Sequence, residues 1–67
     1  MARVNKYNAY GKTGKNQRKF VICTTMAQEE AAEAAGLIYL GSAPTEKDLI
    51  AEMKGGNYTE NVTLDKI

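Results

Sequence analysis

The segment of residues 19–41 constrains the fold most, because it reads as a strand, a helix and a second strand in direct succession. Residues 20–23 (FVIC) are four successive apolar residues, which is typical of a central strand buried on both faces. Thr25 followed by Gln28 matches the capping box of a helix start, and Gly36 is the residue type expected just after a helix end. The run LIYLG that follows it predicts another buried strand.

Weaker patterns on both sides extend this unit. Residues 4–10 favour a strand of modest propensity, and a polar loop with two glycines follows over residues 11–17. Thr45 can cap a second helix that ends at residue 53 or 54. Residues 61–67 alternate between apolar and polar side chains, as a short edge strand does. The predicted order is therefore β-β-α-β-α-β.

These elements predict an α+β fold, with one three- or four-stranded sheet and two helices packed on one face. The 67 residues form a small single domain, because so short a chain has no room for a second core. Within residues 1–67, we expect residues 1–18 to be a basic hairpin or flexible arm, 19–54 a core of strand-helix-strand-helix, and 55–67 a C-terminal edge strand or tail. The expected core residues are Phe20, Ile22, Met26, Ala27, Ala31, Ala34, Ile38, Leu40, Leu49, Ile50, Met53, Val62 and Leu64.

Charge is distributed unevenly along the chain. Residues 1–20 hold six basic and no acidic residues, whereas residues 21–67 hold three basic and eight acidic ones. Such asymmetry indicates contact with nucleic acid or another acidic surface. We therefore expect a non-enzymatic module that binds the nucleic-acid backbone without sequence specificity. Its expected contacts are Arg3, Lys6, Lys12, Lys15, Arg18 and Lys19 on phosphates, with Tyr7 and Tyr10 stacking on bases.

Other interpretations of the same residues remain open. The basic segment can be a solvated arm, or it can meet the acidic residues of this chain or of a second copy in a homo-oligomer. The chain can also be a small protein-binding effector or inhibitor, of the size common among phage and mobile-element accessory proteins. It would then act through the acidic helix, with Glu29, Glu30 and Glu33, or through an exposed sheet edge.

Several kinds of chemistry are disfavoured, and we expect no enzyme activity, no metal and no cofactor. There is no His, and Cys23, the single cysteine, is expected to be a buried small hydrophobe. Gly11-Lys12-Thr13 resembles the end of a phosphate-binding loop, but Lys6 stands where that motif needs its first glycine. A helix-turn-helix is disfavoured because eight strand-like residues separate the two helices. One cysteine and no long apolar run favour a cytoplasmic protein without a membrane segment.

Overall fold

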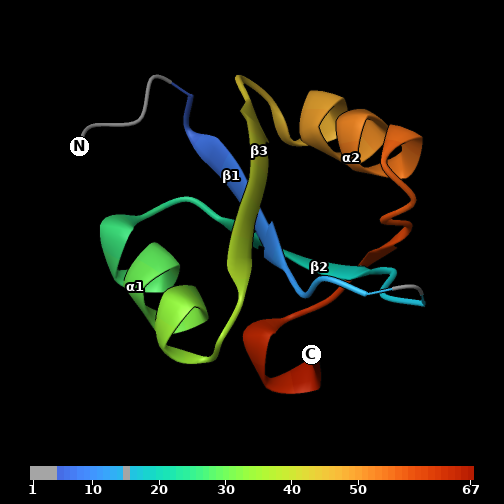
Figure 1. Cartoon of the computed structure of the whole chain (residues 1–67). Coiled ribbons are helices and arrows are strands. Elements are labelled where there is room, and N and C mark those ends of the chain that lie inside the picture. Colours follow the sequence, from blue (N-terminus) through green and yellow to red (C-terminus); the bar gives the residue numbers. More distant parts are fainter. Residues whose placement is uncertain (1–4, 15) are drawn as a thin grey trace.

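The computed structural model describes residues 5–14 and 16–67, and these residues form a four-stranded mixed sheet with two α-helices (Figure 1). The elements in chain order are β1 (Tyr7–Gly11), β2 (Lys19–Cys23), α1 (Met26–Ala34), β3 (Ile38–Ala43), α2 (Glu46–Gly55), β4 (Glu60–Asn61) and a short 3-10 helix (Leu64–Lys66). The predicted α+β class and the predicted order of elements are confirmed.

The strand order is β3-β1-β2-β4, with β1 antiparallel to both of its neighbours and β4 parallel to β2. The chain thus crosses from β2 over β1 to one edge of the sheet, and α2 carries it back to the other edge. Crossovers between parallel strands are almost always right-handed, so two crossovers that run in opposite directions place their helices on opposite faces. The expectation that both helices cover one face is therefore wrong; Figure 1 shows α1 and α2 on either side of the strands.

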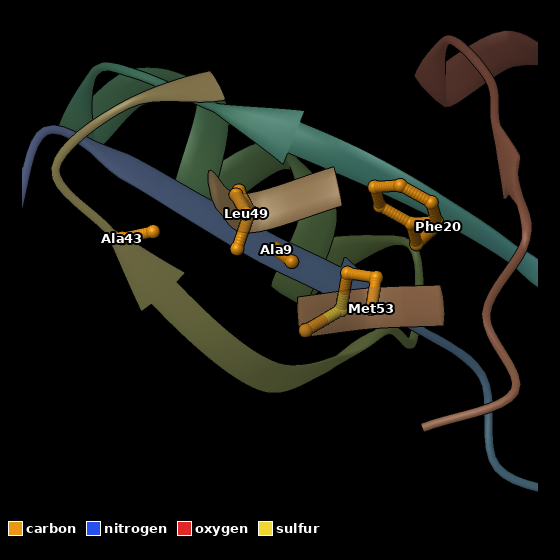
Figure 2. Packing of buried hydrophobic residues seen from close by; sticks show 5 residues of the cluster. All are labelled: Ala9, Phe20, Ala43, Leu49 and Met53. Atoms are coloured by element: carbon orange, nitrogen blue, oxygen red, sulfur yellow. The ribbon is translucent and has the colours of Figure 1, made fainter. Parts of the chain in front are cut away.

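Two hydrophobic clusters, one on each face, reflect this arrangement. The α2-side core consists of Ala9, Phe20, Ala43, Leu49 and Met53, which Figure 2 shows gathered between α2 and the sheet. The α1-side core consists of Tyr10, Val21, Cys23, Ala32 and Leu37. Adjacent residues of a strand point to opposite faces, so the strands β1 and β2 contribute alternate side chains to each core.

Both helices begin with the local chemistry that the sequence indicates, and α1 also ends with it, whereas α2 extends to Gly55, one residue beyond the predicted end. The Thr25 and Thr45 hydroxyls each accept a hydrogen bond from the backbone N–H three residues later, at 3.2 Å. The Gln28 side chain reaches back to the backbone N–H of Thr24 at 2.7 Å. Gly36 has φ of +87°, and the N–H of Leu37 returns to the carbonyl of residue 32, which is a Schellman ending of α1.

The burial of α1 differs from the sequence prediction. Its buried residues are Glu29 and Ala32, so the helix turns a narrow stripe to the sheet. The stripe of Met26, Ala27, Ala31 and Ala34 expected in the core is exposed, and so is Ile38 at the start of β3. Phe20, Leu49 and Met53 are buried as predicted. The remaining expected core residues are half-buried and pack against one of the two cores: Ile22, Leu40, Ile50, Val62 and Leu64.

The C-terminal edge strand is shorter than predicted. β4 pairs with β2 only at Glu60 and Asn61, and the last ladder bond runs from the N–H of Val62 to the carbonyl of Phe20. The chain then turns, because Val62, Leu64 and Ile67 pack against the α1-side core. Among residues 5–14 and 16–67, no helix has both the length and the apolar character needed to cross a bilayer.

Candidate functional site

Three of the six predicted cations lie, within the described residues, in the loop between β1 and β2 or at the first residue of β2. We call residues 12–19 the basic loop; its described cations are Lys12, Arg18 and Lys19, all of them exposed, and Lys15 belongs to it by sequence. Gly14 has φ of +139°, a conformation that other residues rarely adopt, and its carbonyl accepts from the N–H of Gln17 at 3.4 Å. The described cations of the loop are thus exposed at one end of the sheet.

The segment after α2 holds the backbone of the basic loop in place. The Tyr58 hydroxyl donates to the carbonyl of Lys12 at 2.9 Å. The carbonyl of Arg18 accepts from the N–H groups of Thr59 and Glu60 at 3.0 and 2.9 Å. Both arms of the loop are thus fixed from one neighbouring segment, which leaves the Arg18 side chain free to project from an ordered backbone.

Gly11, at the end of β1, lets these parts approach closely. A Cβ atom there would lie 2.8 Å from Leu40 Cδ1, 3.0 Å from the carbonyl oxygen of Lys19 and 3.3 Å from the Tyr58 ring. Any side chain at this position would push the two arms of the hairpin and Tyr58 apart. Glycine at this position therefore allows the close packing at the base of the basic loop.

A small polar hollow lies beside the basic loop. It has a volume of about 350 Å³ and is lined by Gln17, Arg18, Asn57 and Thr59. A guanidinium, two amides and a hydroxyl offer hydrogen-bond donors to anionic oxygens. Asn57, Tyr58 and Thr59 were not among the predicted site residues, since the sequence marks the region after Gly55-Gly56 only as a helix end.

All acidic residues of the chain follow residue 28, and one of them lies in register with the basic loop. The first acidic residue of the chain is Glu29, and its side chain is buried. The nearest acidic residue along the ladder is Glu60, the register partner of Lys19 in β4, which partly offsets the charge of that lysine. Lys12 donates from Nζ to the Ile67 backbone oxygen at 3.3 Å. Arg18 is consequently the cation of the described loop best placed to meet a phosphate.

Lys6 and Tyr7 lie at the opposite end of β1 from the basic loop. The Lys6 Nζ stands 5.7 Å from the centre of the Tyr7 ring, and Tyr7 itself is half-buried against the α2-side core. Four residue steps along a strand span roughly 14 Å, so these two residues form a group separate from the loop. Arg3 and Lys15, which were also predicted to contact phosphate, lie outside the described residues.

Tyr10 cannot stack on a base, and that prediction is wrong. Its side chain is 1% exposed and belongs to the α1-side core. The hydroxyl donates to Glu29 Oε1 at 2.9 Å, and the ring meets Tyr39 edge to face with centres 5.6 Å apart. The alternation of β1 decides this outcome, because it turns Tyr10 toward α1.

The acidic surface predicted on the first helix is also incorrect in part. Glu29 is 5% exposed and faces the sheet, where it accepts the Tyr10 hydrogen bond. Glu30 and Glu33 are exposed. The three glutamates therefore do not form one contact surface.

Cys23 lies in the α1-side core and is buried. Burial raises the pKa of its thiol above the ordinary 9.0, and the negative charge of Glu29 raises it further. The thiol consequently stays protonated at neutral pH, which disfavours a role as nucleophile. Among the described residues, no group of three or more His, Cys, Asp or Glu side chains is placed to hold a metal ion.

The raised pKa makes a prediction about alkaline stability. The unfolded chain releases the Cys23 proton at a lower pH than the folded chain, so the thiol makes folding less favourable as pH rises above about 9. We measure the free energy of unfolding by urea titration between about pH 8 and pH 10, for the unmodified protein and for Cys23→Ala. We expect it to fall more steeply with pH in the unmodified protein, and the two slopes should differ by up to about 1.4 kcal/mol per pH unit. Parallel pH profiles for the two proteins would contradict this assignment.

A larger hollow of about 560 Å³ lies along β2 beyond the end of β4. Its lining includes Ile22, Ala31, Val62 and Leu64, with Glu46 as its charged residue. Tyr7 is the one predicted site residue that it contains. It therefore does not extend the basic loop.

Comparison with known proteins finds no family model, no curated protein and no solved structure that matches this chain.

Proposed function

We propose that this protein is a non-enzymatic module that binds the phosphodiester backbone of nucleic acid through the basic loop. The observation that carries the proposal is the exposed set of Lys12, Arg18 and Lys19 on a loop whose backbone is hydrogen-bonded in place. Lys15 adds a further cation in the sequence of the same loop. The surrounding stretch of residues 1–28 contains no acidic residue.

The proposed mechanism is electrostatic. Lysine and arginine side chains replace the condensed counterions of the backbone, and the released ions supply the free energy of binding. The guanidinium of Arg18 can hold two phosphate oxygens at once, and the amides beside it in the polar hollow can donate further hydrogen bonds. With Tyr10 buried, the site has few groups for stacking on or reading bases. Binding should consequently be insensitive to sequence.

The proposal is tested by fluorescence anisotropy with labelled mixed-sequence oligonucleotides. Single- and double-stranded DNA and RNA are titrated at several salt concentrations. We expect micromolar binding. The logarithm of the association constant should fall against log salt with a slope of about −3 to −4, because the loop carries four cations. The four ligands separate a preference for one sugar or strand state from general backbone binding. No binding to any of them at low salt would overturn the proposed function.

A charge-matched pair of variants assigns the contact to the loop. Arg18→Gln/Lys19→Gln removes two positive charges from the basic loop and should weaken binding and reduce the salt slope by about 2. Lys47→Glu changes the net charge by the same amount on the exposed start of α2 and should leave the slope nearly unchanged. Equal effects from both proteins would indicate that net charge, and not this loop, governs binding.

The alternative of a protein contact through the acidic helix loses support, because Glu29 is buried. The exposed sheet edge that the same alternative invoked is present in β3.

A further inference from the structure

β3 is an open edge of the sheet. Its inner side pairs with β1, and in the sheet order no strand follows it on the outer side within the described residues. Figure 1 shows β3 in front of β1, with no other element drawn over it. Ile38 and Tyr39 are 45% and 41% exposed. No charged residue occurs between Glu33 and Glu46, so the edge lacks the lysines that commonly keep edge strands from pairing.

The hydrogen-bond pattern identifies the backbone groups on the inner side of β3. The Phe20 carbonyl accepts a hydrogen bond from the N–H of Val62, so the backbone groups of Phe20 face the β4 side. The N–H and C=O groups of successive residues face opposite neighbouring strands, and those of Val21 therefore face β1. Tyr10 is the register partner of Val21, and its backbone groups therefore face β2. The backbone groups of Ala9 and Gly11, on either side of Tyr10, therefore face β3. The backbone groups of their partners in β3 face β1 in turn.

Those inward-facing partners are Ile38 and Gly41. Leu40 has no partner in β1, because the register shifts there and forms a β-bulge. Alternation from Ile38 and Gly41 consequently turns the N–H and C=O groups of Tyr39 and Ser42 outward. Without the bulge, two residues three apart would point to opposite sides of the strand.

The sequence of β3, IYLGSA, is complementary to itself when it is reversed. Three large residues precede three small ones, so antiparallel pairing about a two-fold axis places each large residue opposite a small one. The pairs are Ile38 with Ala43, Tyr39 with Ser42, and Leu40 with Gly41.

Each pair also lies on one face of the sheet. Ala43 and Leu40 pack toward the α2-side core, and a Cβ on Gly41 would meet Met53 of that core at 3.3 Å. Tyr39 packs on Tyr10, in the α1-side core.

We propose that β3 pairs with β3 of a second copy of this chain, antiparallel and about a two-fold axis, to give one continuous eight-stranded sheet. Tyr39 and Ser42 of the two copies form the hydrogen-bonded pairs, and each pair exchanges two N–H···O bonds. The bulge is present in both copies, so Tyr39 and Ser42 have the same spacing in each strand. Both hydrogen-bonded pairs can therefore form at once. A domain of 67 residues gains from such burial, since its own core is small.

One charged side chain lies close to the proposed two-fold axis. A Cβ on Gly41 would be 3.3 Å from Glu52 Oε1, so this carboxylate sits above the middle of β3. Pairing Gly41 with Leu40 of the second copy brings the two Glu52 carboxylates near each other. Their repulsion is screened by salt, and the dimer should therefore tighten as salt is added. Nucleic-acid binding by the basic loop has the opposite salt dependence, which makes the two proposals separable.

The first test is sedimentation equilibrium of the full chain from about 1 µM to about 1 mM at two salt concentrations. We expect the mass to rise from 7.3 kDa toward twice that value, with a lower dissociation constant at high salt. A monomer at every concentration would overturn the proposal and leave the edge to a strand of a different protein. A dimer that dissociates with added salt would also overturn it, because it would indicate contact between basic and acidic surfaces.

A pair of matched variants tests the edge itself. Tyr39→Lys and Ala34→Lys each add one positive charge at an exposed position, the first on β3 and the second on α1. We expect at least a tenfold weaker dimer for the first and no change for the second. Ile38→Lys serves as a second edge variant if circular dichroism shows that Tyr39→Lys does not fold. Equal dimerisation of the edge variant and the control would overturn the pairing.

Disulfide trapping tests the register. Tyr39→Cys mixed with Ser42→Cys should form a covalent dimer under mild oxidation, because these positions are opposite in the proposed ladder. Each variant alone should cross-link at least several-fold less, and so should a mixture of Tyr39→Cys with Ala34→Cys. The native Cys23 is buried and does not compete. Equal cross-linking in all mixtures, or none in any, would overturn the proposed register.

Discussion

Leu49→Ala is expected to lower the free energy of unfolding by about 2–5 kcal/mol, which is comparable to the whole stability of a domain this small. Leu49 is 0% exposed and belongs to the α2-side core, where Figure 2 shows it with Ala43 on one side and Phe20 and Met53 on the other. Truncation removes buried apolar surface and leaves a cavity that a single short helix cannot easily fill. A substantial unfolded fraction should therefore be present at 25 °C.

Urea titration followed by circular dichroism measures this loss. Ile50→Ala is the matched control, since Ile50 is the next residue of α2 but is only half-buried. We expect its effect to be less than half that of Leu49→Ala. Equal losses from the two variants would show that α2 is not anchored through Leu49.

The sequence was sufficient wherever a signal is local. The apolar run of β2, the two threonine caps and Gly36 each act within a few residues, and all of them occur in the structure as predicted. Leu49 and Met53 are one turn apart, so the buried face of α2 follows from helical spacing alone. These features required no knowledge of the sheet order.

The buried face of α1 could not be predicted in the same way. Alanine is small enough to face either the sheet or the solvent, so the stripe of Ala27, Ala31 and Ala34 carries little directional information. The structure buries Glu29 and Ala32 in place of this stripe, and Glu29 meets the Tyr10 hydroxyl of β1. The two helices occupy opposite faces because their crossovers run in opposite directions, which depends on strand order and not on local pattern.

The candidate site was visible in the sequence as charge but not as geometry. The cations of the basic loop are adjacent in the chain, and their exposure follows from a polar loop between two strands. Their backbone support comes from Tyr58, whose hydrogen bond to Lys12 joins residues 46 positions apart. No periodicity or motif encodes such a contact, so the polar hollow beside Arg18 emerges only from the fold.

Tyr10→Ala is expected to destabilise the protein by about 3–5 kcal/mol, and Tyr10→Phe by about 1–3 kcal/mol. The first change removes a ring that is 1% exposed in the α1-side core. The second keeps the ring and removes the hydroxyl, whose 2.9 Å hydrogen bond to the buried Glu29 carboxylate helps to offset the desolvation of that group. Both effects are measured by urea titration at neutral pH.

Comparing Tyr10→Phe with Tyr7→Phe separates a structural role of Tyr10 from the stacking role that the sequence suggested. Tyr7→Phe is the matched control, because Tyr7 is half-buried and no partner for its hydroxyl occurs among residues 5–14 and 16–67. We expect it to change stability by less than about 0.5 kcal/mol. Folded Tyr10→Phe should bind oligonucleotides as tightly as the unmodified protein, since its ring never reaches the surface. Weaker nucleic-acid binding by Tyr10→Phe at unchanged stability would place this side chain in the interface and contradict its position beneath α1.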